Sequence, residues 1–149
     1  MNRRHFLKST CGICLSATAL SALMDSCQAV HYVSGSLGKD GMTVPIGEFA
    51  VGDPTHRKYR PYLIVRNEAL QFPICVYRLG DLEYTALWMQ CSHQGAELQA
   101  AGDRLTCPAH GSEFDARGSV RQGPASGNLR TFPVTVAGDH LFIDLKPQS

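Results

Sequence analysis

The chain has 149 residues, of which 44% are hydrophobic and 18% are charged, and its formal net charge is +1. A chain of this length fits one domain, and this composition excludes both a highly charged disordered chain and a bundle of membrane-spanning helices. Because the sequence has no long basic run and few aromatic residues beside its basic ones, it gives no support to nucleic-acid binding.

The first 27 residues have the layout of an export signal. A basic start, MNRRHFLK, is followed by a mildly apolar run, CGICLSATALSALM, that is too short to span a membrane comfortably. The start resembles the twin-arginine signal of folded, cofactor-loaded proteins, with Arg3 and Arg4 as its two arginines. We therefore predict a twin-arginine-type signal over residues 1–27 and a location in the periplasm or on the extracytoplasmic face of a membrane. An uncleaved anchoring helix is the alternative.

A second signal overlaps the first at LMDSC. This stretch resembles the box before the lipidated cysteine of bacterial lipoproteins, with Cys27 as the candidate acceptor, although Asp25 is unusual there. Acylation of Cys27 would hold the protein to a membrane surface through a lipid anchor without spanning the bilayer. Cleavage near Ala29 without lipidation is the competing prediction.

The rest of the chain predicts an all-β domain. Residues 28–58 are rich in glycine, proline and polar residues, so we expect a tether that runs into an edge strand. Residues 59–149 form the predicted domain, in which turn signals separate stretches rich in branched and aromatic residues: PYLIVRN, FPICVYRL, EYTALWMQ and RTFPVTVAGDHLFIDL. No long apolar pattern of helical period occurs there. The pattern predicts roughly eight or more short strands in a small antiparallel sandwich or barrel.

A glycine-rich segment at about residues 90–127 is predicted to form a small site subdomain. Two short loops in it each supply one thiol and one imidazole: Cys91 and His93 in CSHQGA, and Cys107 and His110 in CPAHGSEFD. Thiolates and neutral imidazoles are ligands of soft and borderline metals, so the four could hold zinc or an iron–sulfur cluster. Zinc fingers pair two cysteines on one knuckle and two histidines on a helix. One Cys and one His per loop fits a binuclear cluster better.

The two loops, together with GSEFD and a downstream GPAS, resemble the Rieske iron–sulfur family. The resemblance covers about residues 85–145 and implies a Rieske-like antiparallel β-sandwich or barrel with one Rieske-type 2Fe–2S cluster. Cys91 and Cys107 would then bind the inner iron, and His93 and His110 the solvent-facing iron. Two thiolates and two neutral imidazoles leave the oxidised centre uncharged, whereas four thiolates would make it a dianion, so the reduction potential is raised.

Further positions are predicted to tune the cluster. Ser112 stands where high-potential members donate a hydroxyl hydrogen bond to a bridging sulfide, which raises the potential. Phe114 keeps the ring of a tyrosine in those members but lacks its hydroxyl donor, and Ala96 and Ala109 stand where quinol-oxidising members carry a disulfide. Pro124 lies in a segment that resembles the family's proline loop, which covers the cluster. We expect an intermediate potential and a site whose folding depends on the cluster.

The sequence offers no nucleophile with an adjacent base, no acid pair and no phosphate loop, so it predicts an electron carrier rather than a stand-alone enzyme. Ser92 and Ser112 lie in the two loops, where a hydrogen-bonding role suffices for them. Cys75, in an apolar run, is predicted to be a buried free thiol.

The predicted function is that of an exported protein that relays single electrons to or from a redox protein or membrane oxidoreductase. The alternative is the Rieske subunit of a quinol-oxidising, cytochrome bc-type complex, with quinol as a partner; Phe114, Ala96 and Ala109 count against it. A ferredoxin component of an oxygenase and a structural zinc module are further alternatives.

Overall fold

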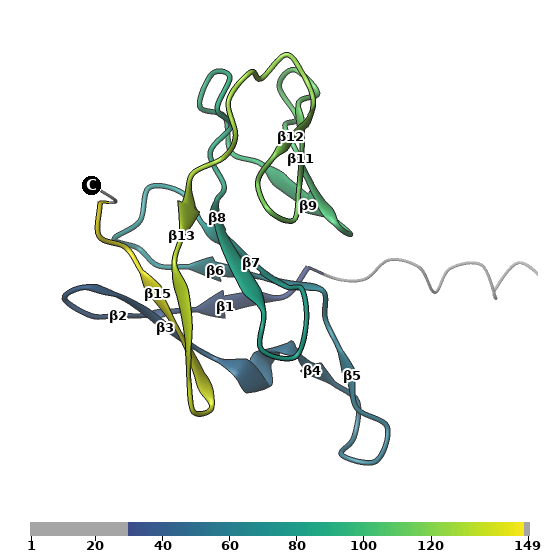
Figure 1. The fold of residues 1–149 in the computed structure, drawn as a ribbon, viewed down its shortest axis with the longest axis vertical. Coiled ribbons are helices and arrows are strands. Elements are labelled where there is room, and N and C mark those ends of the chain that lie inside the picture. The colour runs from purple at the N-terminus through teal and green to yellow at the C-terminus, as the bar shows by residue number, and fades with distance from the viewer. Residues whose placement is uncertain (1–29, 148–149) are drawn as a thin grey trace, which may run out of the picture.

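The computed structural model of the chain describes residues 30–147 (Figure 1). The predicted signal over residues 1–27 and the candidate lipidation site Cys27 lie outside these residues. No helix within the described range is long and apolar enough to cross a membrane. The described part consists of fifteen short strands and one single-turn 3₁₀ helix, so the predicted all-β fold class is confirmed.

In chain order the strands are β1 (Tyr32–Ser34), β2 (Ser36–Leu37), β3 (Gly41–Pro45), β4 (Ala50–Val51), β5 (Lys58–Tyr59), β6 (Tyr62–Arg66), β7 (Ile74–Arg78), β8 (Tyr84–Trp88), β9 (Gln99–Ala101), β10 (Arg104–Thr106), β11 (Glu113–Asp115), β12 (Val120–Gln122), β13 (Thr131–Phe132), β14 (Val134–Ala137) and β15 (His140–Asp144), with the 3₁₀ helix Ile46–Phe49 between β3 and β4. They form a five-stranded sheet of order β1-β6-β7-β8-β13, two four-stranded sheets of order β14-β15-β3-β2 and β12-β11-β10-β9, and the β4–β5 pair. All the pairings are antiparallel except β1 with β6, which is parallel.

The central strands β6 and β7 of the five-stranded sheet are buried on both faces. Leu63 and Val65 of β6 belong to a core shared with β3 and β15, whereas Tyr62 and Ile64 belong to a second core that also contains residues of β10 and β11. Successive side chains of a strand point to opposite faces, so a strand covered on both sides needs a nearly continuous apolar run. This requirement explains why β6 and β7 read as unbroken hydrophobic stretches in the sequence.

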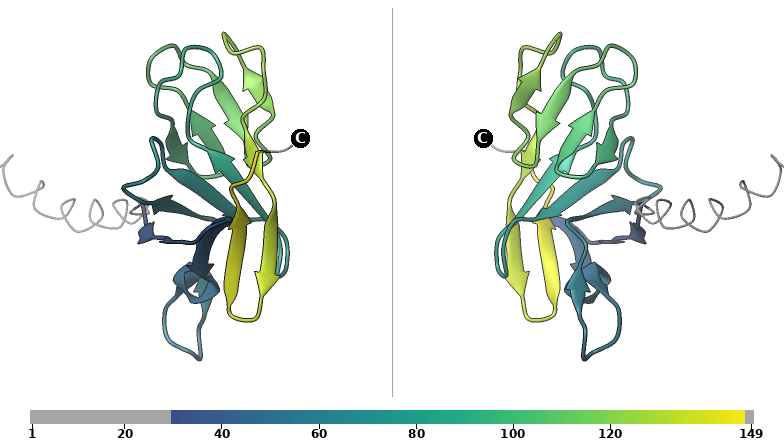
Figure 2. Two further views of the ribbon diagram at one scale, coloured as in Figure 1. Left: turned by 90° about the vertical axis from the view of Figure 1, so that its left-hand side faces the viewer. Right: turned by 90° about the vertical axis from the view of Figure 1, so that its right-hand side faces the viewer.

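The sheet β12-β11-β10-β9 and the loops around it form the predicted site subdomain. In Figure 1 this subdomain lies at the top of the molecule, and the β4–β5 and β14–β15 turns lie at the bottom. The side views in Figure 2 keep the same separation. The second core joins the subdomain to the body through Leu105 and Phe114, both fully buried. The loops at the tip are therefore carried on a packed base.

The prediction of a tether over residues 28–58 was wrong. The described part of this stretch, residues 30–58, contains β1 to β4 and the start of β5, and both β1 and β2 are edge strands of their sheets. Met42 and Val44 of β3 are fully buried, and β3 lies between β15 and β2. Gly41 permits this packing because a Cβ there would lie 2.2 Å from the Ile143 carbonyl oxygen. The domain therefore begins well before residue 59, and this glycine marks close packing rather than a linker.

The strands predicted from the apolar stretches are present as β6, β7 and β8. At the C-terminal end, β14 and β15 pair around the predicted Ala-Gly-Asp turn, with Ala137 opposite His140. Cys75 of β7 is a free and fully buried thiol, as predicted. Burial raises the pKa of its thiol, so Cys75 is an inert core residue rather than a metal ligand.

Candidate metal centre

Two loops of matching construction carry the four predicted ligands. The first Cys-His loop (residues 91–96) follows β8, and the second Cys-His loop (residues 107–112) joins β10 to β11. In the first, the Gly95 amide donates to the Cys91 carbonyl over 2.9 Å; in the second, the Gly111 amide donates to the Cys107 carbonyl over 2.9 Å. Each of these glycines has a positive φ, 77° and 75°, which only glycine adopts without strain.

Each loop is also closed across its base. The Cys91 amide donates to the Ala96 carbonyl and the Cys107 amide donates to the Ser112 carbonyl, both over 2.8 Å. Two equivalent turns therefore place Cys91 and Cys107 in equivalent positions, with the histidine two residues later in the first loop and three residues later in the second.

The thiols lie inside the subdomain and the imidazoles lie at its surface. Cys91 and Cys107 are only 3% and 1% exposed and belong to the second core, whereas His93 and His110 are exposed. The two imidazole rings meet edge to face with their centroids 5.1 Å apart. The structure thus brings the four predicted residues together as one sulfur pair and one nitrogen pair.

The surroundings of Cys107 favour a thiolate. Burial raises the pKa of its thiol, but hydrogen bonds from the His110 and Ala109 amides and from the Cys91 thiol outweigh this effect, and the net pKa is lowered. A thiolate is the form of cysteine that binds metals.

The donor set fits a two-iron cluster. Two thiols on the inner side and two imidazoles on the outer side suit two metal ions with two protein ligands each. Soft sulfur donors and borderline nitrogen donors are the ligands that iron–sulfur chemistry uses.

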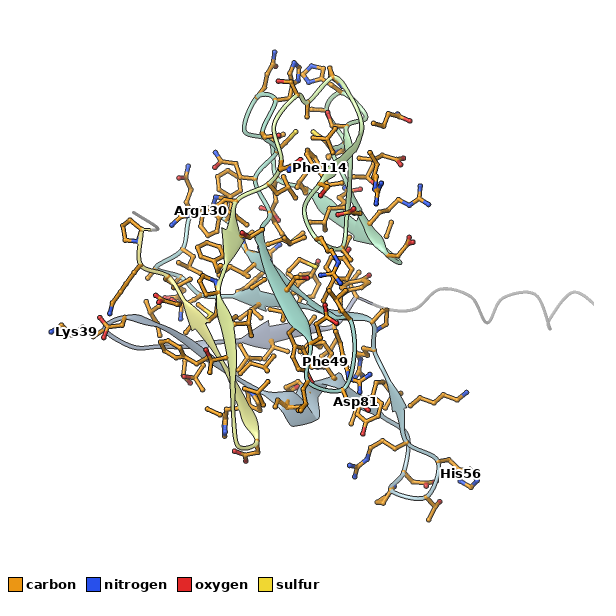
Figure 3. The ribbon with its side chains drawn as sticks, viewed as in Figure 1. Lys39, Phe49, His56, Asp81, Phe114 and Arg130 are labelled. Carbon is orange, nitrogen blue, oxygen red and sulfur yellow. The ribbon has the colours of Figure 1, made fainter. Side chains whose placement is uncertain are left out.

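The predicted tuning residues lie directly below or beside the loops. Ser112 is fully buried, and its Oγ accepts a hydrogen bond from the Ala125 amide over 3.0 Å, so its own proton remains free to donate. Phe114 is fully buried beneath the tip (Figure 3) and pairs with Leu105 across β10 and β11. Its ring fills space there but offers no donor. Pro124 follows a cis peptide bond and is exposed, in the loop that lies beside Ser112.

One connection at the tip was missed in the sequence. The Ser92 hydroxyl, between Cys91 and His93, donates to the Gly127 carbonyl over 2.5 Å. The sequence predicted a hydrogen-bonding role for Ser92 but no partner, because Gly127 is 35 residues away and no local pattern links the two.

The exposed rim of the site carries no formal charge. Residues 91–96, 107–112 and 123–128 include no Asp, Glu, Lys or Arg. His93, Gln94, Pro108, Ala109 and His110 are the exposed side chains of the two Cys-His loops beside the small Ser92. A cavity of about 590 Å³ opens elsewhere, between Arg66, Phe72 and Glu97, and none of the four candidate ligands lines it. The candidate centre therefore faces outward on a neutral tip rather than lining a substrate pocket.

Comparisons with known proteins agree with this geometry. A family model described as "Rieske [2Fe-2S] domain" matches residues 54–133. The cytochrome b6-f complex iron-sulfur subunit 2 of Trichormus variabilis is 28% identical over an alignment of 167 positions, which covers 96% of this chain and 84% of that protein. The cytochrome b6-f complex iron-sulfur subunit 1 of Synechocystis sp. is 33% identical over 104 residues, 66% of this chain and 49% of that protein.

Among solved structures, the cyanobacterial plasma membrane Rieske protein PetC3 from Synechocystis PCC 6803 matches with a TM-score of 0.50 and 28% identity. The match covers 56% of this chain and 86% of that one.

Proposed function

This chain belongs to the Rieske [2Fe–2S] domain family, and we propose that it is the electron-relaying subunit of a quinol-oxidising membrane complex. It carries one Rieske-type 2Fe–2S cluster, which when bound holds one electron at a time. Cys91 and Cys107 hold the cluster on the buried side, and His93 and His110 hold it at the rim.

The observation that carries the proposal is the exposed pair of imidazoles on an uncharged tip. Because His93 and His110 are the exposed candidate ligands, a partner that docks on the tip approaches the centre from their side. A rim without Asp, Glu, Lys or Arg suits a neutral, partly apolar docking surface, such as the one around a quinol site, better than a charged one. Similarity to the b6-f iron–sulfur subunit over 96% of this chain supports the same role.

A second candidate function is that of a free exported electron carrier. Three residues favour it: Phe114 in place of a tyrosine, and Ala96 and Ala109 in place of two cysteines. At these positions the resemblance to the quinol-oxidising members breaks down.

For either function we propose export by the twin-arginine route to the periplasm or the extracytoplasmic face of a membrane. A lipid anchor on Cys27 would then keep the domain at the membrane surface.

Purification from native membranes separates the two functions. For the subunit, we expect the full chain to co-purify in mild detergent with a b-type haem protein, and the rate of its reduction by a quinol to vary little with ionic strength. Charged docking surfaces make such rates fall steeply with salt. Recovery of the chain alone, with membrane retention abolished by Cys27→Ala and no reduction by quinol, would instead establish the free carrier.

A further inference from the structure

One segment is hydrogen-bonded to both Cys-His loops. We call this segment, residues 123–128, the covering loop. Its Gly127 carbonyl accepts a hydrogen bond from the Ser92 hydroxyl of the first Cys-His loop over 2.5 Å. From its other side, the Ala125 amide donates to the Ser112 hydroxyl of the second loop over 3.0 Å. Serines of the two Cys-His loops, one in each, are thus attached to the same short stretch of chain.

The covering loop is itself fixed at both ends. Just before it, the side-chain Nε2 of Gln122 donates to the Gly111 carbonyl of the second Cys-His loop over 3.1 Å. At its last residue, the Asn128 Oδ1 accepts a hydrogen bond from the Val120 amide over 3.1 Å, and just after the loop the Leu129 amide donates to the Gly118 carbonyl over 2.8 Å. A segment held in this way can restrain the loops to which it is tied.

Neither a disulfide nor a backbone hydrogen bond joins the two Cys-His loops directly in the described part of the chain. All three cysteines within residues 30–147 are free. Side chains of the candidate ligands do meet between the two loops, Cys91 with Cys107 and His93 with His110. Without those ligands engaged, the spacing of the loops depends on the covering loop.

We propose that the covering loop is a non-covalent strap that holds the two Cys-His loops in register, with Ser92 as the positioning residue at one end and Ser112 at the other. It does here what a disulfide between the positions of Ala96 and Ala109 does in quinol-oxidising members. The inference rests on the proposal that Cys91, His93, Cys107 and His110 hold the cluster. Ser92 itself binds neither iron nor sulfide; its hydroxyl fixes the backbone between two ligands.

Ser92 is the position at which the strap can be tested. Ser112 is fully buried and has a second predicted role toward the cluster, so replacing it changes two things at once. Ser92 is exposed, and removing its hydroxyl leaves the core intact. Because water can replace part of the lost bond, we expect a moderate effect, roughly three- to tenfold in a rate, the upper value corresponding to about 1.4 kcal/mol.

The experiment measures how fast the visible absorbance of the full-length, cluster-loaded protein bleaches in the presence of an iron chelator. Ser92→Ala should bleach roughly three- to tenfold faster than the wild type, and Ser92→Thr should restore the wild-type rate. The matched control is Ser126→Ala. Ser126 is an exposed serine in the covering loop, and its hydroxyl makes no hydrogen bond to the described residues.

Two further measurements keep the test decisive. Hydrogen exchange of the Ala125 amide should accelerate in Ser92→Ala while the amides of β6 and β7 keep their wild-type rates, because only the strap has loosened. Adding Ala96→Cys and Ala109→Cys to Ser92→Ala, oxidised to the disulfide, should return bleaching to the wild-type rate, and should restore loading if Ser92→Ala alone does not load.

The strap is refuted if Ser92→Ala bleaches no faster than Ser126→Ala, or if its Ala125 amide exchanges as in the wild type. Failure of the disulfide to compensate refutes it equally. These outcomes differ from failure of the proposed function, in which the wild-type protein itself shows no cluster.

Discussion

Replacing Ser112 with alanine should lower the reduction potential of the cluster. In the fold the Ser112 Oγ already accepts a hydrogen bond from the Ala125 amide, which leaves its own proton free to donate. A hydrogen bond to a charged group contributes about 1.5–3 kcal/mol. If the donor stabilises mainly the reduced, more negative form, its loss lowers the potential by about 60–130 mV, since 59 mV corresponds to a tenfold change in a one-electron equilibrium.

The assay is a redox titration of the purified, cluster-loaded protein, followed by its visible absorbance or by the paramagnetic signal of the reduced form. Ser112→Ala also leaves the buried Ala125 amide without its acceptor, at a cost of about 1–3 kcal/mol of stability, so the titration must be made on protein shown to be folded and loaded. Ser126→Ala controls for loss of a serine hydroxyl from the same region.

An unchanged midpoint potential in loaded Ser112→Ala would refute this reasoning. It would mean that the hydroxyl proton does not reach the cluster and that Ser112 acts only through the covering loop.

Three other changes test different parts of the structure. Phe114→Tyr should raise the midpoint potential in a redox titration, because it adds a hydroxyl donor to a fully buried ring below the loops; a lower potential would contradict this. Gly41→Ala should lower the melting temperature, with a loss of about 1–3 kcal/mol, because its Cβ would lie 2.2 Å from the Ile143 carbonyl oxygen; unchanged melting would show that β3 can move. Burial raises the pKa of Asp115, but hydrogen bonds from the Ser119 and Arg117 amides and the nearby Arg121 outweigh it and lower the pKa. Its stabilisation is therefore present above the usual pKa of about 3.9 and is lost as the pH falls through the lower folded value, and Asp115→Asn should remove this part of the acid dependence in urea unfolding measured against pH.

The apolar stretches were sufficient to predict β6, β7 and β8, because strands buried on both faces must be nearly all apolar. They were not sufficient for β3. Met42 and Val44 alternate with polar neighbours over only a few residues, and Gly41 reads as a linker signal unless its distance from Ile143 is known. Long-range packing decided the role of that glycine, and no local pattern records it.

The sequence was likewise sufficient to predict some features of the candidate site and not others. Cys91, His93, Cys107 and His110 could be picked out because their types and spacings are unusual and repeat in two loops. The ties from Ser92 to Gly127 and from Ala125 to Ser112 could not, because a serine hydroxyl and a backbone group carry no sequence signature of their pairing. In the fold the two cysteines are buried and the two histidines are exposed, which is the arrangement that the family resemblance implies for the two irons.

The most direct test of this account is pulsed electron paramagnetic resonance of the dithionite-reduced, full-length protein labelled with nitrogen-15 histidine. We expect a signal from a reduced 2Fe–2S cluster coupled to two histidine nitrogens, with the coupling altered or lost in His93→Ala and His110→Ala but kept in His140→Ala. A protein without a signal, or a signal without histidine coupling, would contradict it.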